Sequence, residues 1–141
     1  MFDLDTCIAF ITNNAAKKIS DEFNDRLSEL GITRVQWTAL YYLGKHKSIS
    51  QIELADQMDI KPSTTARLID RMERDGFVKR ERDINDRRTV NLMITDKGRE
   101  FREKLFPVGE KMSKDVSKGI SDDEIEIFKN VLKKMVNNIN G

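Results

Sequence analysis

The chain has 141 residues, 38% of them hydrophobic and 35% charged, with a net charge of +1, which suits one domain of ordinary size. No apolar run approaches the roughly 18–20 residues that span a membrane, and the acidic first residues lack the basic region of a secretory signal. The only cysteine, Cys7, and the only histidine, His46, exclude an internal disulfide and argue against a metal centre. We therefore expect a cytoplasmic protein without a cofactor.

The first predicted elements are two helices. Apolar residues at steps of three and four from Leu4 to Leu30 predict one amphipathic helix of about 27 residues, which Gly31 would end. Thr33 is placed to cap a second helix that runs to Gly44.

Two further helices follow in a pattern typical of a helix-turn-helix. Ser50 and Glu53 have the spacing of a capping box at the start of a short helix that reaches about Met58. Pro62 suits the first position of a longer helix, and Gly76 suits its end.

The hydrophobic period then changes to two between Phe77 and Ile94, which indicates a β-hairpin with its turn at residues 83–86. Thr95 is placed to cap the next helix, and Ser121 the last one. The order predicts a mainly α protein of the α+β class, with a winged helix-turn-helix domain over residues 31–99.

The longer helix of the helix-turn-helix has one apolar stripe and, opposite it, a polar face. That face carries Pro62, Ser63, Thr64, Arg67 and Arg71. Small side chains at a helix start let the first-turn amides approach phosphates, and an arginine one to two turns in can reach guanine. We therefore predict a DNA-reading helix, the alternative being a solvated surface on which the arginines pair with nearby acids.

The hairpin turn ends in two adjacent arginines, Arg87 and Arg88, after the acidic residues Asp83 and Asp86. A hairpin that follows a recognition helix is a wing, and arginine suits the narrow, electronegative minor groove beside it. The alternative is a solubilising turn in which the same aspartates pair with the arginines.

The run "KPSTTARLIDRMERDGFVKRERDINDRRTVNLMITDKG" resembles the core of the multiple antibiotic resistance regulator (MarR) family. The shared features are the end of the recognition helix through Arg80, the "DINDRR" turn and the closing "ITDKG". Upstream, "LGITRVQWTALYYL" is similar to the second-helix segment of the family.

The resemblance implies a homodimeric transcription regulator, usually a repressor, that binds a palindromic operator in double-stranded DNA. It implies recognition-helix contacts for Ser63, Thr64 and Arg67, a minor-groove role for Arg87, and a wing-holding or backbone role for Asp86 and Arg88. Many members of the family release DNA when a small phenolic or other aromatic effector binds between the dimer helices and the winged domain.

Residues 1–30 and 100–141 are the predicted helical dimerisation region. The long apolar stripe of the first helix is too extensive for a small winged domain to cover, and the last helix has heptad spacing. Its apolar positions are Ile125, Phe128, Leu132, Met135 and Ile139. The alternative is that the two terminal helices pack on each other within one subunit.

Three side chains have open interpretations. Cys7 lies where one branch of the family places a peroxide-sensing cysteine, but the tyrosines expected beside such a thiol are missing, since no Tyr precedes Tyr41; a buried interface cysteine is the alternative. Trp37 and Tyr41 can border an effector pocket or belong to the core.

Two other classes of function compete with DNA-binding regulation. A winged-helix protein-interaction module usually lacks the exposed basic helix face predicted here. An enzyme is disfavoured because the sequence has no nucleophile–base pair, no phosphate-cradling glycine loop and no metal-ligand spacing.

Overall fold

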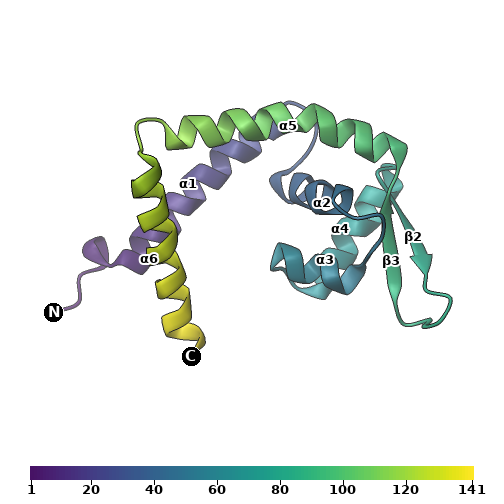
Figure 1. Cartoon of the computed structure of the whole chain (residues 1–141), viewed down its shortest axis with the longest axis horizontal. Helices are drawn as coiled ribbons and strands as arrows, with labels where there is room; N and C mark the ends of the chain where they lie inside the picture. The colour runs from purple at the N-terminus through teal and green to yellow at the C-terminus, as the bar shows by residue number, and fades with distance from the viewer. The chain divides into compact units, whose positions relative to one another are not determined.

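The computed structural model describes residues 1–141 as six α-helices, a short 3-10 helix and a three-stranded antiparallel sheet, as Figure 1 shows. In chain order the elements are η1 (Leu4–Thr6), α1 (Ile8–Ser28), α2 (Arg34–Gly44), β1 (Ile49–Ser50), α3 (Gln51–Met58), α4 (Pro62–Arg74), β2 (Val78–Arg82), β3 (Val90–Ile94), α5 (Asp96–Ser117) and α6 (Asp122–Asn140). They form two compact units, Met1–Glu110 and Lys111–Gly141. The mainly α class and the winged helix-turn-helix are confirmed.

The core of the first unit lies where α2, α3, α4 and the sheet meet. Leu40, Leu54, Ile69 and Leu92, one from each of these elements, have no exposed surface. Burial of such side chains stabilises a fold by about 1.5–3 kcal/mol each. This shared core fixes α4 against the hairpin that follows it (Figure 1).

Local capping accounts for the helix starts. Thr33 and Gln36 form a reciprocal capping box at the start of α2, and Ser121 forms one with Glu124 at the start of α6. Ser50 accepts the backbone amide of Glu53 at 3.1 Å, but the Glu53 side chain does not return a bond. The capping box predicted for α3 is therefore only half formed.

The single first helix predicted from Leu4 to Leu30 is wrong at its start. A 3-10 turn over Leu4–Thr6 precedes Cys7, which is extended (φ −71°, ψ 119°) and forms the N-cap of the 21-residue helix α1. Asp3 accepts the amide of Asp5 and so stabilises the separate short turn. An apolar period cannot reveal such a break, because the side-chain spacing continues across it.

The sheet has the strand order β1-β3-β2. The hairpin strands pair from Val78 opposite Ile94 to Arg82 opposite Val90, which confirms the predicted wing. The sequence prediction missed β1, whose two residues Ile49–Ser50 pair with Leu92 and Asn91. Two residues are too few to show a period of two.

The terminal helices carry apolar side chains on their surfaces. On α1, Ile8 is 63% exposed and Ile11 48%; on α6, Ile127 is 63% exposed and Phe128 60%. No residue of α6 is buried. None of the helices combines the length and the apolar character that a membrane crossing requires.

The start of α5 is tied closely to the start of the wing. Thr95 donates its hydroxyl to the carbonyl of Gly76 at 2.6 Å and accepts the amide of Gly98 at 3.0 Å. A Cβ on Gly98 would overlap the carbonyl oxygen of Phe77. Glycine is therefore the residue that allows α5 to begin against the backbone of the hairpin.

We expect Gly98→Ala to lower the free energy of unfolding by about 1–3 kcal/mol, the range for overpacking a buried site. Gly109→Ala is the matched control, because its new methyl group would lie 3.5 Å from the Trp37 ring, an ordinary contact, and alanine favours a helix. Urea denaturation of both variants measures the difference. Equal stability of the two variants would contradict the close approach at Gly98.

Candidate nucleic-acid interface

Helix α4 presents a polar, unpaired face. Thr65, Ile69 and Met72 are buried against the core, and the opposite side exposes the residues predicted to meet DNA: Pro62, Ser63, Thr64, Arg67 and Arg71. None of these arginines, nor Arg74, forms an ion pair. The predicted alternative, a helix surface neutralised by its own acids, does not match these contacts.

The first turn of α4 is open to a ligand. Pro62 occupies the first helical position, and Lys61 before it gives no side-chain cap. The amides of the first turn therefore keep free hydrogen atoms, and the positive end of the helix dipole is uncovered. The hydroxyls of Ser63 and Thr64 lie in the same exposed turn. Such an arrangement suits a phosphate oxygen or an acceptor on a base edge.

The acids of α4 bind the wing instead, through Arg80 on β2. The Arg80 guanidinium pairs with Asp70 and with Glu73 (3.4 Å), and it donates to the Ala66 carbonyl at 2.9 Å. It also donates to the side-chain oxygen of Gln51 on α3 at 3.2 Å. One side chain thus joins both helices of the helix-turn-helix to the hairpin.

Sequence reasoning did not identify this role for Arg80. It was counted only as part of the family pattern, because the residues it contacts are 7 to 29 positions away in sequence. Only the packing of the hairpin against α4 brings them together.

The wing turn is held by aspartates that bind backbone rather than arginine. Asp83 accepts the amides of Asn85 (2.8 Å) and Asp86 (3.3 Å) and the side-chain amide of Asn91 (3.2 Å). These bonds, that of the Asn85 amide first, lower the pKa of Asp83 below its ordinary value, because they stabilise the charged carboxylate.

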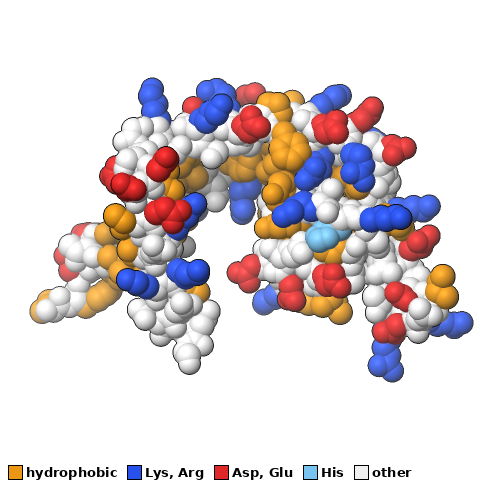
Figure 2. Space-filling view, in the orientation of Figure 1, with side chains coloured by type: hydrophobic (Ala, Val, Ile, Leu, Met, Phe, Trp, Pro, Cys, Tyr) orange, Lys and Arg blue, Asp and Glu red, His pale blue; other side chains and the backbone are white.

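Asp86 completes the turn from its other side. Its carboxylate accepts the amide of Arg88 at 3.0 Å and the hydroxyl of Thr89 at 3.2 Å, and it pairs with neither arginine side chain. Arg82 donates to the carbonyl of Arg87 at 2.8 Å. The guanidinium groups of Arg87 and Arg88 therefore project unpaired, and Figure 2 shows basic side chains at the outer end of the hairpin.

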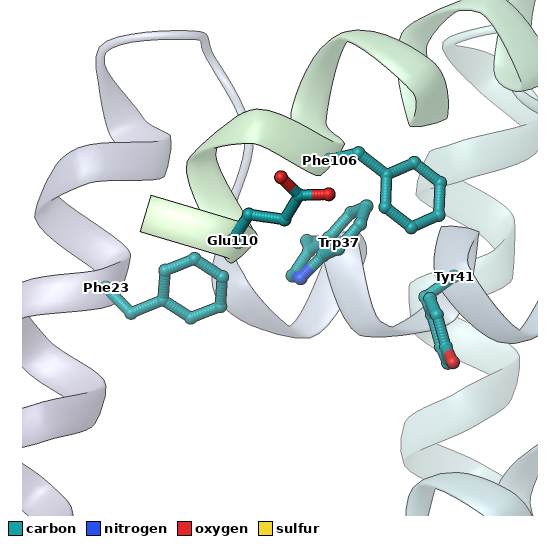
Figure 3. A pocket seen from close by; sticks show the side chains of 6 residues that line it. Phe23, Trp37, Tyr41, Phe106 and Glu110 are labelled. Atoms are coloured by element: carbon teal, nitrogen blue, oxygen red, sulfur yellow. The ribbon is translucent and has the colours of Figure 1, made fainter. Parts of the chain in front are cut away.

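A second site lies away from this surface, where α1, α2 and α5 meet. Trp37 and Tyr41 from α2 line one cavity of about 310 Å³ together with Phe23, Phe106, Gly109 and Glu110, as Figure 3 shows. Sequence reasoning selected the two α2 residues but missed Phe106 and Glu110. Phe106 and Glu110 are four residues apart, and this spacing already places them on the same face of a helix.

The Cys7 thiol lies partly buried at the start of α1. The thiol is free and is in no disulfide. The proposed sensing role of Cys7 therefore stays a prediction.

The comparisons with known proteins agree on one family. The family model for MarR matches residues 32–90. The transcriptional repressor MdtR of Bacillus subtilis is 34% identical over 82 residues, which cover 58% of this chain and 53% of that protein, so the match spans about half of MdtR. The uncharacterised HTH-type transcriptional regulator YsmB of the same organism is 29% identical over 83% of this chain and 80% of its own length.

A mutant of MarR from E. coli, crystallised in complex with operator DNA, has 26% identity and a TM-score of 0.84 over 91% of this chain and 92% of its own. Over residues 32–90 the chain matches the model of the MarR family. The two curated relatives are named as transcription regulators and not as enzymes.

We expect Arg80→Ala to lower the free energy of unfolding by about 1–2 kcal/mol, since it removes several partly exposed charge-assisted bonds and leaves the carboxylates of Asp70 and Glu73 without their shared cation. Lys79→Ala, which removes an exposed neighbouring charge without an ion partner, is the control. Chemical denaturation compares the two. An Arg80→Ala variant as stable as Lys79→Ala would contradict the bracing role.

The lowered pKa of Asp83 gives the wing a dependence on pH. The pKa of Asp83 is lower in the folded protein than in the unfolded chain. The stabilisation of the wing turn by the Asp83 carboxylate is therefore complete above the unfolded pKa and is lost as the pH falls through the folded pKa. We expect amide exchange at Asn85 to speed up over that acidic range and to be fast at every pH in Asp83→Ala. Exchange at Asn85 that is independent of pH, after correction for the intrinsic rate, would contradict this.

Proposed function

We propose that this MarR-family regulator is a repressor that binds a palindromic DNA operator as a homodimer in the cytoplasm and leaves it when a small aromatic effector binds. In each subunit, α4 enters the major groove and the wing enters the neighbouring minor groove. The observation that carries the proposal is that two sets of unpaired arginines, on α4 and on the wing turn, stand on elements joined by Arg80.

The roles of individual side chains follow from their positions. Arg67 and Arg71 lie on the exposed face of α4 beyond its open first turn, within reach of base edges or phosphates. Arg87 projects from the wing turn, and Arg88 is anchored through its amide to Asp86. We assign Arg87 to the minor groove and Arg88 to a phosphate, with Asp86 as the residue that shapes the turn.

Two comparisons support the DNA partner and the direction of regulation. MarR from E. coli, whose fold this chain shares, was crystallised with its operator, and MdtR is named a repressor. The effector is assigned to the aromatic cavity at Trp37 and Tyr41 because it is concave, mostly apolar and carries one charged group, as ligand pockets do.

Selection of bound sequences from a random DNA pool identifies the operator. Against that operator we expect Arg87→Ala to weaken binding by about 1–2 kcal/mol, with the loss concentrated at A·T-rich flanks. Lys104→Ala on α5, the same change of charge outside α4 and the wing, should bind like the parent. If Arg87→Ala also binds like the parent, the wing assignment is wrong, and if the parent selects no sequence at low salt, the protein is not a DNA-binding regulator.

The homodimer has its own test. We expect the parent to sediment as a dimer and Phe128→Lys, which charges the exposed apolar face of α6, to shift the equilibrium towards the monomer. Ile84→Lys at the wing turn, where the isoleucine is 97% exposed, makes the same kind of change away from the terminal helices. Sedimentation velocity measures both variants. A parent that sediments as a monomer would overturn the dimer, and equal behaviour of the two variants would exclude the α6 face from its interface.

A further inference from the structure

The cavity between α1, α2 and α5 is a partial cage of aromatic rings. The Trp37 ring stands edge-to-face with the Phe106 ring (centroids 5.6 Å apart, planes at 86°) and is tilted to the Tyr41 ring at 6.1 Å. Phe23 closes the α1 side (Figure 3). These rings line one open cleft, and the faces of aromatic rings attract cations.

Two of these rings already hold cations of the protein itself. The Arg102 guanidinium lies 4.7 Å from the Phe106 centroid and 5.3 Å from that of Tyr41. It is fixed there by bonds of 3.2 and 3.0 Å from two of its nitrogens to the Tyr41 carbonyl, in space left by Gly44. Lys45 lies 5.4 Å from the Tyr41 centroid. Trp37 and Phe23 have no such partner.

The charge at the cavity wall is negative. Glu110 is the only charged residue that lines the cavity, and its carboxylate forms no ion pair or hydrogen bond. Figure 3 shows its side chain extending from α5 on the side of Trp37 and Phe106. An unpaired carboxylate beside aromatic rings that hold no cation, as Trp37 and Phe23 do here, is a combination that recognises an organic ammonium group.

We propose that this cavity selects organic cations, such as quaternary or protonated amines with an aromatic group. Glu110 is the counter-ion, and the Trp37 and Phe23 rings pack against the charged head. The inference rests on the proposed effector role of the cavity and names the chemical class of the effector. An aromatic acid would bring a second carboxylate towards Glu110, whereas the Arg102 guanidinium is bonded to the Tyr41 carbonyl and does not line the cavity.

Trp37 is the only tryptophan of the chain, so its fluorescence reports on the cavity directly. We expect benzyltrimethylammonium to change this fluorescence saturably and to bind at least about fivefold more tightly than phenylacetate. Glu110→Gln should weaken binding of the cation by about three- to fivefold, and Glu110→Lys should favour phenylacetate. Glu103→Gln, which removes an exposed carboxylate of α5 outside the cavity, should change neither affinity.

Three outcomes would overturn the inference: phenylacetate binding as tightly as the cation, Glu110→Gln behaving like Glu103→Gln, or neither probe binding. A gel-shift assay on the selected operator separates this from the proposed function. If the cation binds with the predicted pattern but the operator stays bound, the cavity is assigned correctly and the release mechanism is wrong. If the parent does not bind DNA at all, the fluorescence titrations still decide the inference.

Discussion

The ion pairs and hydrogen bonds of Arg80 determine how the two proposed DNA-contacting elements stand to each other. This strand residue binds Asp70, Glu73 and the carbonyl of Ala66 on α4, and Gln51 on α3. The Arg80 side chain is about a quarter exposed. It is therefore partly desolvated, and charge-assisted hydrogen bonds are stronger there than on an open surface. The wing is thus fixed at one spacing from α4, as the proposed contacts with two neighbouring grooves require.

The same contacts explain why the arginines that face outwards have no ion partner. On α4 the acids that could neutralise Arg67 and Arg71 are turned towards Arg80. In the wing turn, Asp83 and Asp86 are bound to backbone amides and neighbouring polar side chains. A chain of nearly balanced net charge can therefore present a local positive surface, since the acidic residues of α4 and of the wing turn named above bind other groups of the protein.

The parts of the fold that the sequence predicted are those fixed by local chemistry. Caps at Thr33 and Ser121, Pro62 at a helix start and the period of two across the hairpin each involve residues a few positions apart. The break at Cys7 was missed because a 3-10 turn preserves the apolar spacing. The Arg80 contacts and the grouping of Glu110 with Trp37 depend on tertiary packing, which a single sequence does not encode in any local pattern.

We infer that Arg80 holds the wing at one distance from α4. Spin labels at Thr64→Cys and Asn85→Cys, in a Cys7→Ser background, report that distance by pulsed electron paramagnetic resonance. The labelled chain is diluted with unlabelled chain so that only distances within one subunit are measured. A single narrow distribution in the presence of Arg80, which broadens in Arg80→Met, is the predicted result. A broad distribution with Arg80 in place, or one that Arg80→Met leaves unchanged, would contradict the claim.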